Sequence, residues 1–182
     1  MRLFLAARSV VFVILIPGTV AGYIPWRILA ASHRSPRPSS DIVSLLAAGL
    51  VAAGWGVLLR CVWDFAAAGR GTLAPIDPPR RLVVRGPYRF TRNPMYNGVV
   101  LALLGEALLF RSGALLEYAL AALAVFHLVV ILYEEPALRS RFGDDYAAYA
   151  AAVPRWGWTR HGYGAPRHRP EPRPSARGAG RG

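Results

Sequence analysis

Apolar and polar stretches alternate along the first 133 residues of the chain. Each apolar stretch holds about 20 residues, which is the length of a helix that crosses a bilayer. The polar stretch after the first contains Pro36 and Pro38, which bar a helix there. The pattern predicts an all-α integral membrane protein with about four transmembrane helices. The apolar stretches are residues 9–26, 42–65, 94–110 and 114–133.

The third and fourth predicted helices should form a helical hairpin. Only Arg111, Ser112 and Gly113 separate them, so the chain has no room to leave the membrane region between them. A further set of apolar side chains then recurs at helical spacing, which predicts an interfacial amphipathic helix with Asp144 or Asp145 able to cap it. The recurring side chains are Leu138, Phe142, Tyr146, Tyr149 and Val153.

Within the apolar stretches, two local features add detail. Ser40 or Asp41 can cap the second helix. Its glycines Gly49, Gly54 and Gly56 allow close helix packing. The basic start and apolar centre of the first stretch also occur in signal peptides, but "TVAGY" is a poor cleavage site and the stretch is long, so we expect a retained span.

Composition and charge support a membrane protein. The 182-residue chain is 54% hydrophobic yet carries a net charge of +12. Its basic residues flank the apolar stretches, which argues against nucleic-acid binding and for multi-pass insertion. They are all arginine, and with abundant Ala, Gly and Pro they suggest a GC-rich bacterial genome. We therefore expect a bacterial cytoplasmic membrane protein with the lipid bilayer as its partner.

The arginines also predict the orientation. The first and third connections hold three and one, whereas the second holds six and the region after residue 133 holds nine. Both termini and the active site are expected on the cytoplasmic side. The chain divides into two N-terminal helices with their loop (1–65), a core of loop, hairpin and interfacial helix (66–163), and a disordered basic tail (164–182).

A polar segment stands at the start of the third helix. "RGPYRFTRNPMYNG", residues 85–98, is called the box below. One interpretation is helix punctuation, because Asn93 is a preferred N-cap and Pro94 suits the first helical position. Arg89, Arg92 and the box tyrosines would then lie at the headgroups.

A pair of adjacent carboxylates, Glu134 and Glu135, suggests more than punctuation. Acidic side chains are unfavourable at a helix C-terminus, so a compensating partner is expected. Counted from Ser112, Pro94 lies 18 residues back and Glu134 lies 22 residues forward, which at about 1.5 Å per residue is about 27 Å and about 33 Å. The box and the carboxylates should therefore meet at one membrane face.

These motifs resemble a known group of proteins. "GPYRFTRNPMYNG", followed by "EEPALRSRFGDDYAAYAAAVPRW", is similar to the isoprenylcysteine carboxyl methyltransferase and phospholipid methyltransferase superfamily. Its pattern runs G-x-Y-x-x-x-R-H-P-x-Y-x-G, E-E-x-x-L and F-G-x-x-Y-x-x-Y. The resemblance covers residues 80–156 and implies a membrane enzyme that moves the methyl group of S-adenosylmethionine to a lipidic or prenylated small-molecule acceptor.

The resemblance also implies roles for single residues. Binding of S-adenosylmethionine would fall to Val83, Tyr88, Asn93, Pro94, Tyr96 and Glu134. Independently, tyrosine faces suit a sulfonium cation and a carboxylate suits adenosine hydroxyls. No covalent nucleophile is required, and no catalytic residue is assigned. Cys61 is the single cysteine, so no metal site is expected.

Two departures from the pattern concern the acceptor. Asn93 replaces histidine and cannot titrate near neutral pH. Val130 stands where the carboxyl methyltransferases have an arginine for the substrate carboxylate, a role that Arg89 or Arg139 could take. Carboxyl O-methylation, as in the isoprenylcysteine enzymes, and phospholipid N-methylation both stay open.

Two alternatives to a methyltransferase stay open, and the remaining polar residues of the spans have simpler expected roles. The alternatives are an NADPH-dependent membrane reductase of the sterol reductase type and a non-enzymatic membrane protein. Arg60 and Asp64, spaced i to i+4, are expected to form an ion pair. Glu106 is expected to make a polar helix contact or accept a proton, and His127 to be a satisfied packing residue.

Overall fold

The computed structural model describes residues 16–32, 41–68, 82 and 84–164, with side chains up to residue 64 in the second of these ranges. Throughout these ranges the regular structure is helical and no strand occurs, so the all-α class is confirmed there. The elements are η1 (Thr19–Tyr23), α2 (Ile24–Ala31), α3 (Ile42–Ala68), η2 (Gly86–Arg89), α4 (Pro94–Leu109), α5 (Gly113–Val129), η3 (Val130–Glu134) and α6 (Glu135–Ala152).

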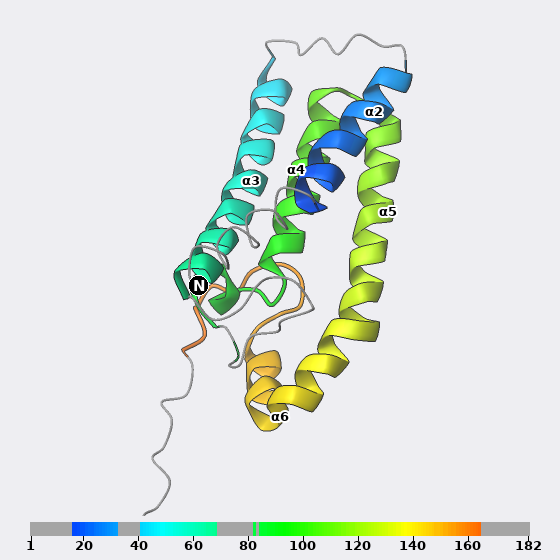
Figure 1. Ribbon diagram of the computed structural model, residues 1–182. Helices are drawn as coiled ribbons and strands as arrows, with labels where there is room; N and C mark the ends of the chain where they lie inside the picture. The colour runs from blue at the N-terminus through cyan, green and yellow to red at the C-terminus, as the bar shows by residue number, and fades with distance from the viewer. Residues whose placement is uncertain (1–15, 33–40, 69–81, 83, 165–182) are drawn as a thin grey trace, which may run out of the picture.

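Long apolar helices form the body of the molecule. Figure 1 shows α3, α4 and α5 side by side, with α2 against one end of the group and α6 at the other. Ile42–Asp64 and Gly113–Ala152 are long and apolar enough to cross a membrane, whereas α4 is shorter. Large apolar side chains remain exposed along α3 and α5, as expected for surfaces that face lipid. The prediction of four spans and a membrane hairpin stays a prediction.

The contact between α3 and α4 depends on glycine. A Cβ on Gly54 would lie 2.5 Å from the carbonyl oxygen of Gly98 and 2.6 Å from the nitrogen of Ala102. By contrast, a Cβ on Gly49 or Gly56 would meet nothing within 4 Å. The expectation of close packing is therefore correct for Gly54 and wrong for the other two, which lie on the exposed face of α3.

One helix end differs from the sequence prediction, and the start of α3 agrees with it. The first helix continues past residue 26 to Ala31, because nothing between Arg27 and Ala31 breaks a helix. The start of α3 is as expected, since Oδ1 of Asp41 accepts a hydrogen bond from the backbone nitrogen of Ser44 at 2.9 Å. Ser112 caps α5 in the same way, through Leu115.

The carboxylate pair does not end a helix. α5 passes through the π-helical turn η3 directly into α6, so Glu134 and Glu135 lie inside one bent helical path (Figure 1). Pro136 follows at once and has no N–H to donate, and the wider π turn accommodates it. The sequence-based expectation of a helix C-terminus here is therefore wrong, and the two carboxylates need partners for another reason, their burial.

The amphipathic pattern of α6 is confirmed. Tyr146, Tyr149 and Val153 are buried in a small apolar cluster, against which Leu138 and Phe142 also pack. At Gly143 the chain has φ 49° and ψ −122°, a conformation that favours glycine, so the helix is kinked there. Among the described hydrogen bonds of α6, none is a capping bond from Asp144 or Asp145. The kink turns the second half of α6 towards Leu82 and Val84, just before the box.

Candidate active site

The second residue of the box, Gly86, stands where no other residue fits. Gly86 has φ 53°, and a Cβ there would overlap the carboxylate of Asp64 near the end of α3. Asp64 also accepts a hydrogen bond from Nε of Arg60 at 3.1 Å, so the expected ion pair is confirmed. The absence of a side chain at Gly86 thus lets the box fold directly against α3.

Asn93 holds the N-cap position of α4 but does not cap it. Its side chain makes no capping hydrogen bond. Instead Nδ2 of Asn93 donates to the backbone carbonyl of Arg155 at 3.1 Å. Pro94 occupies the first turn and has no N–H that needs a partner, which lowers the need for a cap. The amide therefore joins the start of α4 to a segment 62 residues away.

Tyr96 connects the box to the end of η3. Its hydroxyl donates to Oε1 of Glu134 at 2.5 Å, and its ring stacks on Phe126 of α5 with centroids 4.7 Å apart. The box and the carboxylates thus meet, as the helix lengths predicted. Within the described part of the chain, Tyr96 is the one hydrogen-bond donor to Glu134, so the second carboxylate oxygen can accept from a ligand.

Tyr88 lies on the same side of the box as Tyr96 and Glu134. Burial raises its pKa well above the ordinary value, and nearby Cys61, Tyr149, Glu134 and Tyr96 raise it further. The phenol is therefore neutral at physiological pH. The backbone carbonyl of Tyr88 accepts a hydrogen bond from the hydroxyl of Tyr149 at 2.7 Å, which fixes η2 against α6.

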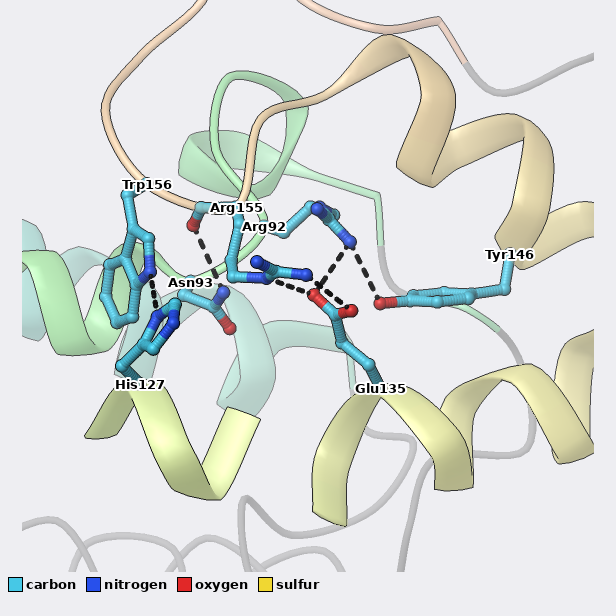
Figure 2. A network of polar contacts seen from close by, with 7 residues as sticks. All are labelled: Arg92, Asn93, His127, Glu135, Tyr146, Arg155 and Trp156. Carbon is cyan, nitrogen blue, oxygen red and sulfur yellow. Dashed lines mark hydrogen bonds and ion pairs between the residues drawn. The ribbon is translucent and has the colours of Figure 1, made fainter. Parts of the chain in front are cut away.

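Glu135 is the centre of a second, more deeply buried network. It is 7% exposed and is shown in Figure 2 with its neighbours around it. Arg155 donates to both of its oxygens, from Nε at 2.6 Å and from Nη2 at 2.9 Å. Nη1 of Arg92 donates to Oε1 at 3.0 Å and to the hydroxyl of Tyr146 at 3.3 Å. The hydrogen bonds that Arg155 donates to Glu135 raise the pKa of Arg155 above its ordinary value, so this guanidinium stays charged.

Residues 154–163, called the strap below, run alongside the box. Backbone hydrogen bonds join Arg92 N to Pro154 O at 2.9 Å, Thr159 N to Phe90 O at 2.9 Å, and Tyr163 N to Arg89 O at 2.8 Å. The ring of Trp158 contacts that of Phe90. The strap is thus a wall of the box. The sequence placed residues 154–163 in the core but predicted no contact between them and the box.

The predicted site residues have different surroundings. Tyr88, Tyr96 and Glu134 lie together, and Asn93 and Pro94 are next to them in the box. Val83 lies outside the described residues. Of the two predicted acceptor ligands, Arg89 donates from Nε to the carbonyl of Tyr163 at 3.1 Å, and Arg139 is exposed on α6.

Several residues of the site were missed by sequence reasoning. Glu135 was recognised as needing a partner, but Arg92 was assigned to headgroups and Arg155 to no role. Tyr146 was counted as an apolar position, although its hydroxyl contacts Arg92. The sequence offers one indication of these partners, since two adjacent carboxylates need two sets of hydrogen-bond donors. Nothing in the spacing identifies Arg155 as the donor.

Two further polar side chains lie near or within the helices. Nε1 of Trp156 donates to Nδ1 of His127 at 3.0 Å, so His127 is satisfied, as expected. Oε2 of Glu106 is buried and has no hydrogen-bond partner among the described atoms. The expected polar helix contact of Glu106 is therefore not seen at this oxygen. No group of three or more metal-ligating side chains occurs in the ranges that the structure describes.

The residue types around Glu134 fit S-adenosylmethionine. Glu134 has an oxygen that receives no hydrogen bond from the described residues and could accept from a hydroxyl, and tyrosine, the residue type at positions 88 and 96, suits a sulfonium cation. Nε of Arg92 is buried and has no hydrogen-bond partner among the described atoms, although Nη1 of the same guanidinium donates to Glu135 and Tyr146. Methyl transfer from a sulfonium requires neither a covalent nucleophile nor a metal ion.

The fold and site together define a helical membrane protein with a polar site at one end of its apolar helices. A family model, phospholipid methyltransferase, matches residues 42–145, which is more than half of the chain. The chain therefore belongs to the phospholipid methyltransferase family, a family of membrane methyltransferases within the superfamily that its motifs resemble. Searches of curated proteins and of solved structures found no significant match.

Proposed function

We propose that the protein transfers the methyl group of S-adenosylmethionine to a lipid acceptor at the membrane surface. The contact between Tyr96 and Glu134 carries the proposal, because it joins the two motifs of the family into one site. Tyr88, Asn93, Pro94 and Glu134 would hold the cofactor beside it. Bound S-adenosylmethionine supplies an electrophilic methyl group on a positively charged sulfur.

The acceptor that we favour is a lipid amine. A carboxylate acceptor needs a free cation, and Val130 is 1% exposed where an arginine would provide one. Arg89 is engaged by Tyr163, and both Arg92 and Arg155 are engaged by Glu135. Glu134, which we assign to the cofactor, already places a carboxylate at the site, and a second carboxylate on the acceptor would be repelled by it. Membership of the phospholipid methyltransferase family also supports a phospholipid acceptor.

The chain's own residues would contribute positioning and exclusion of water. Tyr96 orients Glu134 by its hydrogen bond, and Phe126 holds the ring of Tyr96 in place. The ammonium headgroup must lose a proton before its nitrogen can attack. The new C–N bond then replaces the S–CH₃ bond, and the products are a methylated amine, S-adenosylhomocysteine and one proton. Holding the acceptor and cofactor in line can account for much of the acceleration without a covalent intermediate.

The membrane arrangement belongs to the same proposal. Residues 9–26, α3, α4 and α5 would form four spans, with α4 and α5 as a hairpin. The box, Glu134 and both termini would face the cytoplasm, where S-adenosylmethionine is made, and α6 would lie in the interface. The distribution of arginines supports this orientation.

The test is methyl transfer by the purified protein. Protein in nanodiscs is incubated with methyl-labelled S-adenosylmethionine and, in separate reactions, phosphatidylethanolamine or a prenylated cysteine. We expect label in the phospholipid. Label in the prenylcysteine would instead establish carboxyl methylation, and label in neither, with NADPH but not S-adenosylhomocysteine raising the melting temperature, would favour a reductase.

A further inference from the structure

The strap belongs to the site although it lies outside the residues that match the family model. That match ends at residue 145, whereas the strap comprises residues 154–163. Three backbone hydrogen bonds of 2.8–2.9 Å hold it to the box at Arg89, Phe90 and Arg92. Its position therefore depends on contacts made by this chain itself, and the box has the strap as one of its walls.

One carboxylate joins three separate segments at this wall. Glu135 begins α6, Arg92 belongs to the box and Arg155 belongs to the strap. All three charged groups meet within 3.0 Å at the two oxygens of Glu135 (Figure 2). Since Glu135 is 7% exposed, water does not screen these contacts strongly. Moving the strap away would leave Glu135 with Arg92 as its remaining charged partner.

The strap is also bonded to a residue of the candidate cofactor site. Nδ2 of Asn93 donates to the carbonyl of Arg155, the same residue whose guanidinium binds Glu135. The next strap residue, Trp156, donates to His127 on α5 (Figure 2). Arg155 is thus held at its backbone by the box and at its side chain by α6. Any displacement of Arg155 is transmitted to Asn93, one residue before α4.

We propose that Glu135 is a positioning residue that latches the strap, through Arg155, in the conformation that binds the cofactor. This inference rests on the proposed function. Both carboxylate oxygens of Glu135 are engaged by Arg92 and Arg155, so we assign Glu135 no contact with the cofactor. If the latched strap favours cofactor binding, then cofactor binding favours the latched strap by the same factor, because coupling between two equilibria is reciprocal. The position of the strap should therefore depend on whether the cofactor site is occupied.

The test uses the full chain in nanodiscs, with S-adenosylhomocysteine as the probe. Arg155→Gln is the main variant because Arg155 is 33% exposed in its side chain, so the protein should fold, whereas Glu135→Gln could be impaired in folding. Arg155→Gln is expected to raise the Kd for S-adenosylhomocysteine about tenfold. Arg155→Lys keeps the charge but loses the bidentate geometry, so it should give an intermediate Kd.

A second readout follows the strap directly. Trypsin cleavage after the exposed Arg160 should be slowed by S-adenosylhomocysteine in the wild type and faster in Arg155→Gln. Arg27→Gln and Glu117→Gln, exposed and in other parts of the chain, are the matched controls and should behave as the wild type.

The outcomes separate the two proposals. A wild-type Kd in both Arg155→Gln and a folded Glu135→Gln would overturn the latch, as would ligand binding that leaves the cleavage rate unchanged. A purely structural role would speed cleavage in Arg155→Gln without changing the Kd, which also overturns it. Folded wild-type protein that binds no S-adenosylhomocysteine would overturn the proposed function, and the coupling with it.

Discussion

Two adjacent carboxylates define two different regions around the box. On the Glu134 side, one hydroxyl donates to one carboxylate oxygen and the second oxygen remains available. On the Glu135 side, two arginines saturate a carboxylate that is 7% exposed. Neighbouring residues of the same type can therefore have separate tasks, since a helix directs successive side chains to different directions about its axis.

The difference indicates that the Glu135 side stabilises the fold and that the Glu134 side can bind a ligand. A buried carboxylate with a full set of donors has no capacity for a ligand, and removing it leaves two cations without compensation. A carboxylate with one donor costs less to change and has an oxygen to offer. Changes on the Glu135 side should therefore affect folding most, and changes on the Glu134 side should affect binding most.

Replacing Glu135 should have the largest effect on the stability of the protein. Glu135→Ala should lower the free energy of unfolding by about 3–5 kcal/mol, because Arg92 would remain buried without its counter-charge. Denaturant unfolding in detergent micelles measures the change. Glu117→Ala, at an exposed position of α5, should stay within about 0.5 kcal/mol of the wild type. Equal stability of the two variants would refute the structural role of Glu135.

Gly54 tests the helical support that both sides share. Gly54→Ala should lower the free energy of unfolding by about 1–3 kcal/mol, since its Cβ would collide with the backbone of α4. Gly56→Ala meets nothing within 4 Å and should leave stability unchanged or raise it by up to about 1 kcal/mol. Thermal unfolding of the pair in the same detergent gives the comparison, and a reversed order would contradict the packing described for α3 and α4.

A change at Tyr96 tests the Glu134 side, where we expect a larger effect on binding than on stability. Tyr96→Phe removes the hydroxyl that donates to Glu134 but keeps the ring on Phe126. The free energy of unfolding should fall by about 1 kcal/mol or less. The Kd for S-adenosylhomocysteine should rise severalfold, because Glu134 is no longer oriented, and isothermal titration measures it. A stability loss as large as that of Glu135→Ala would mean that the two sides do not differ.

Much of the fold could be predicted because its causes are local. Apolar length located α3, α4 and α5, the cap at Asp41 followed from residue type, and the spacing of α6 identified its buried face. The continuation of α5 into α6 could not be predicted, because it depends on a π turn that accommodates Pro136. The kink at Gly143 likewise depends on where α6 must pack.

The candidate site was predictable on one side only. Tyr96 and Glu134 belong to sequence motifs on helices whose lengths bring them together, so their contact could be expected. The partners of Glu135 come from segments 43 and 20 residues away, and no periodicity links Arg155 to Glu135. Asn93 shows the same limit. Its residue type predicts a cap, but the strap provides a carbonyl at 3.1 Å that takes its amide.

The central claim is that the Glu134 side of the box binds the methyl donor. The most direct test is titration of S-adenosylhomocysteine into wild-type protein and Glu134→Gln in nanodiscs, with the unfolding of both measured in parallel. The account predicts that the wild type binds and that Glu134→Gln raises the Kd by about tenfold or more. The free energy of unfolding should change by less than about 1 kcal/mol. A folded wild type that does not bind, or an unchanged Kd in Glu134→Gln, would contradict the account.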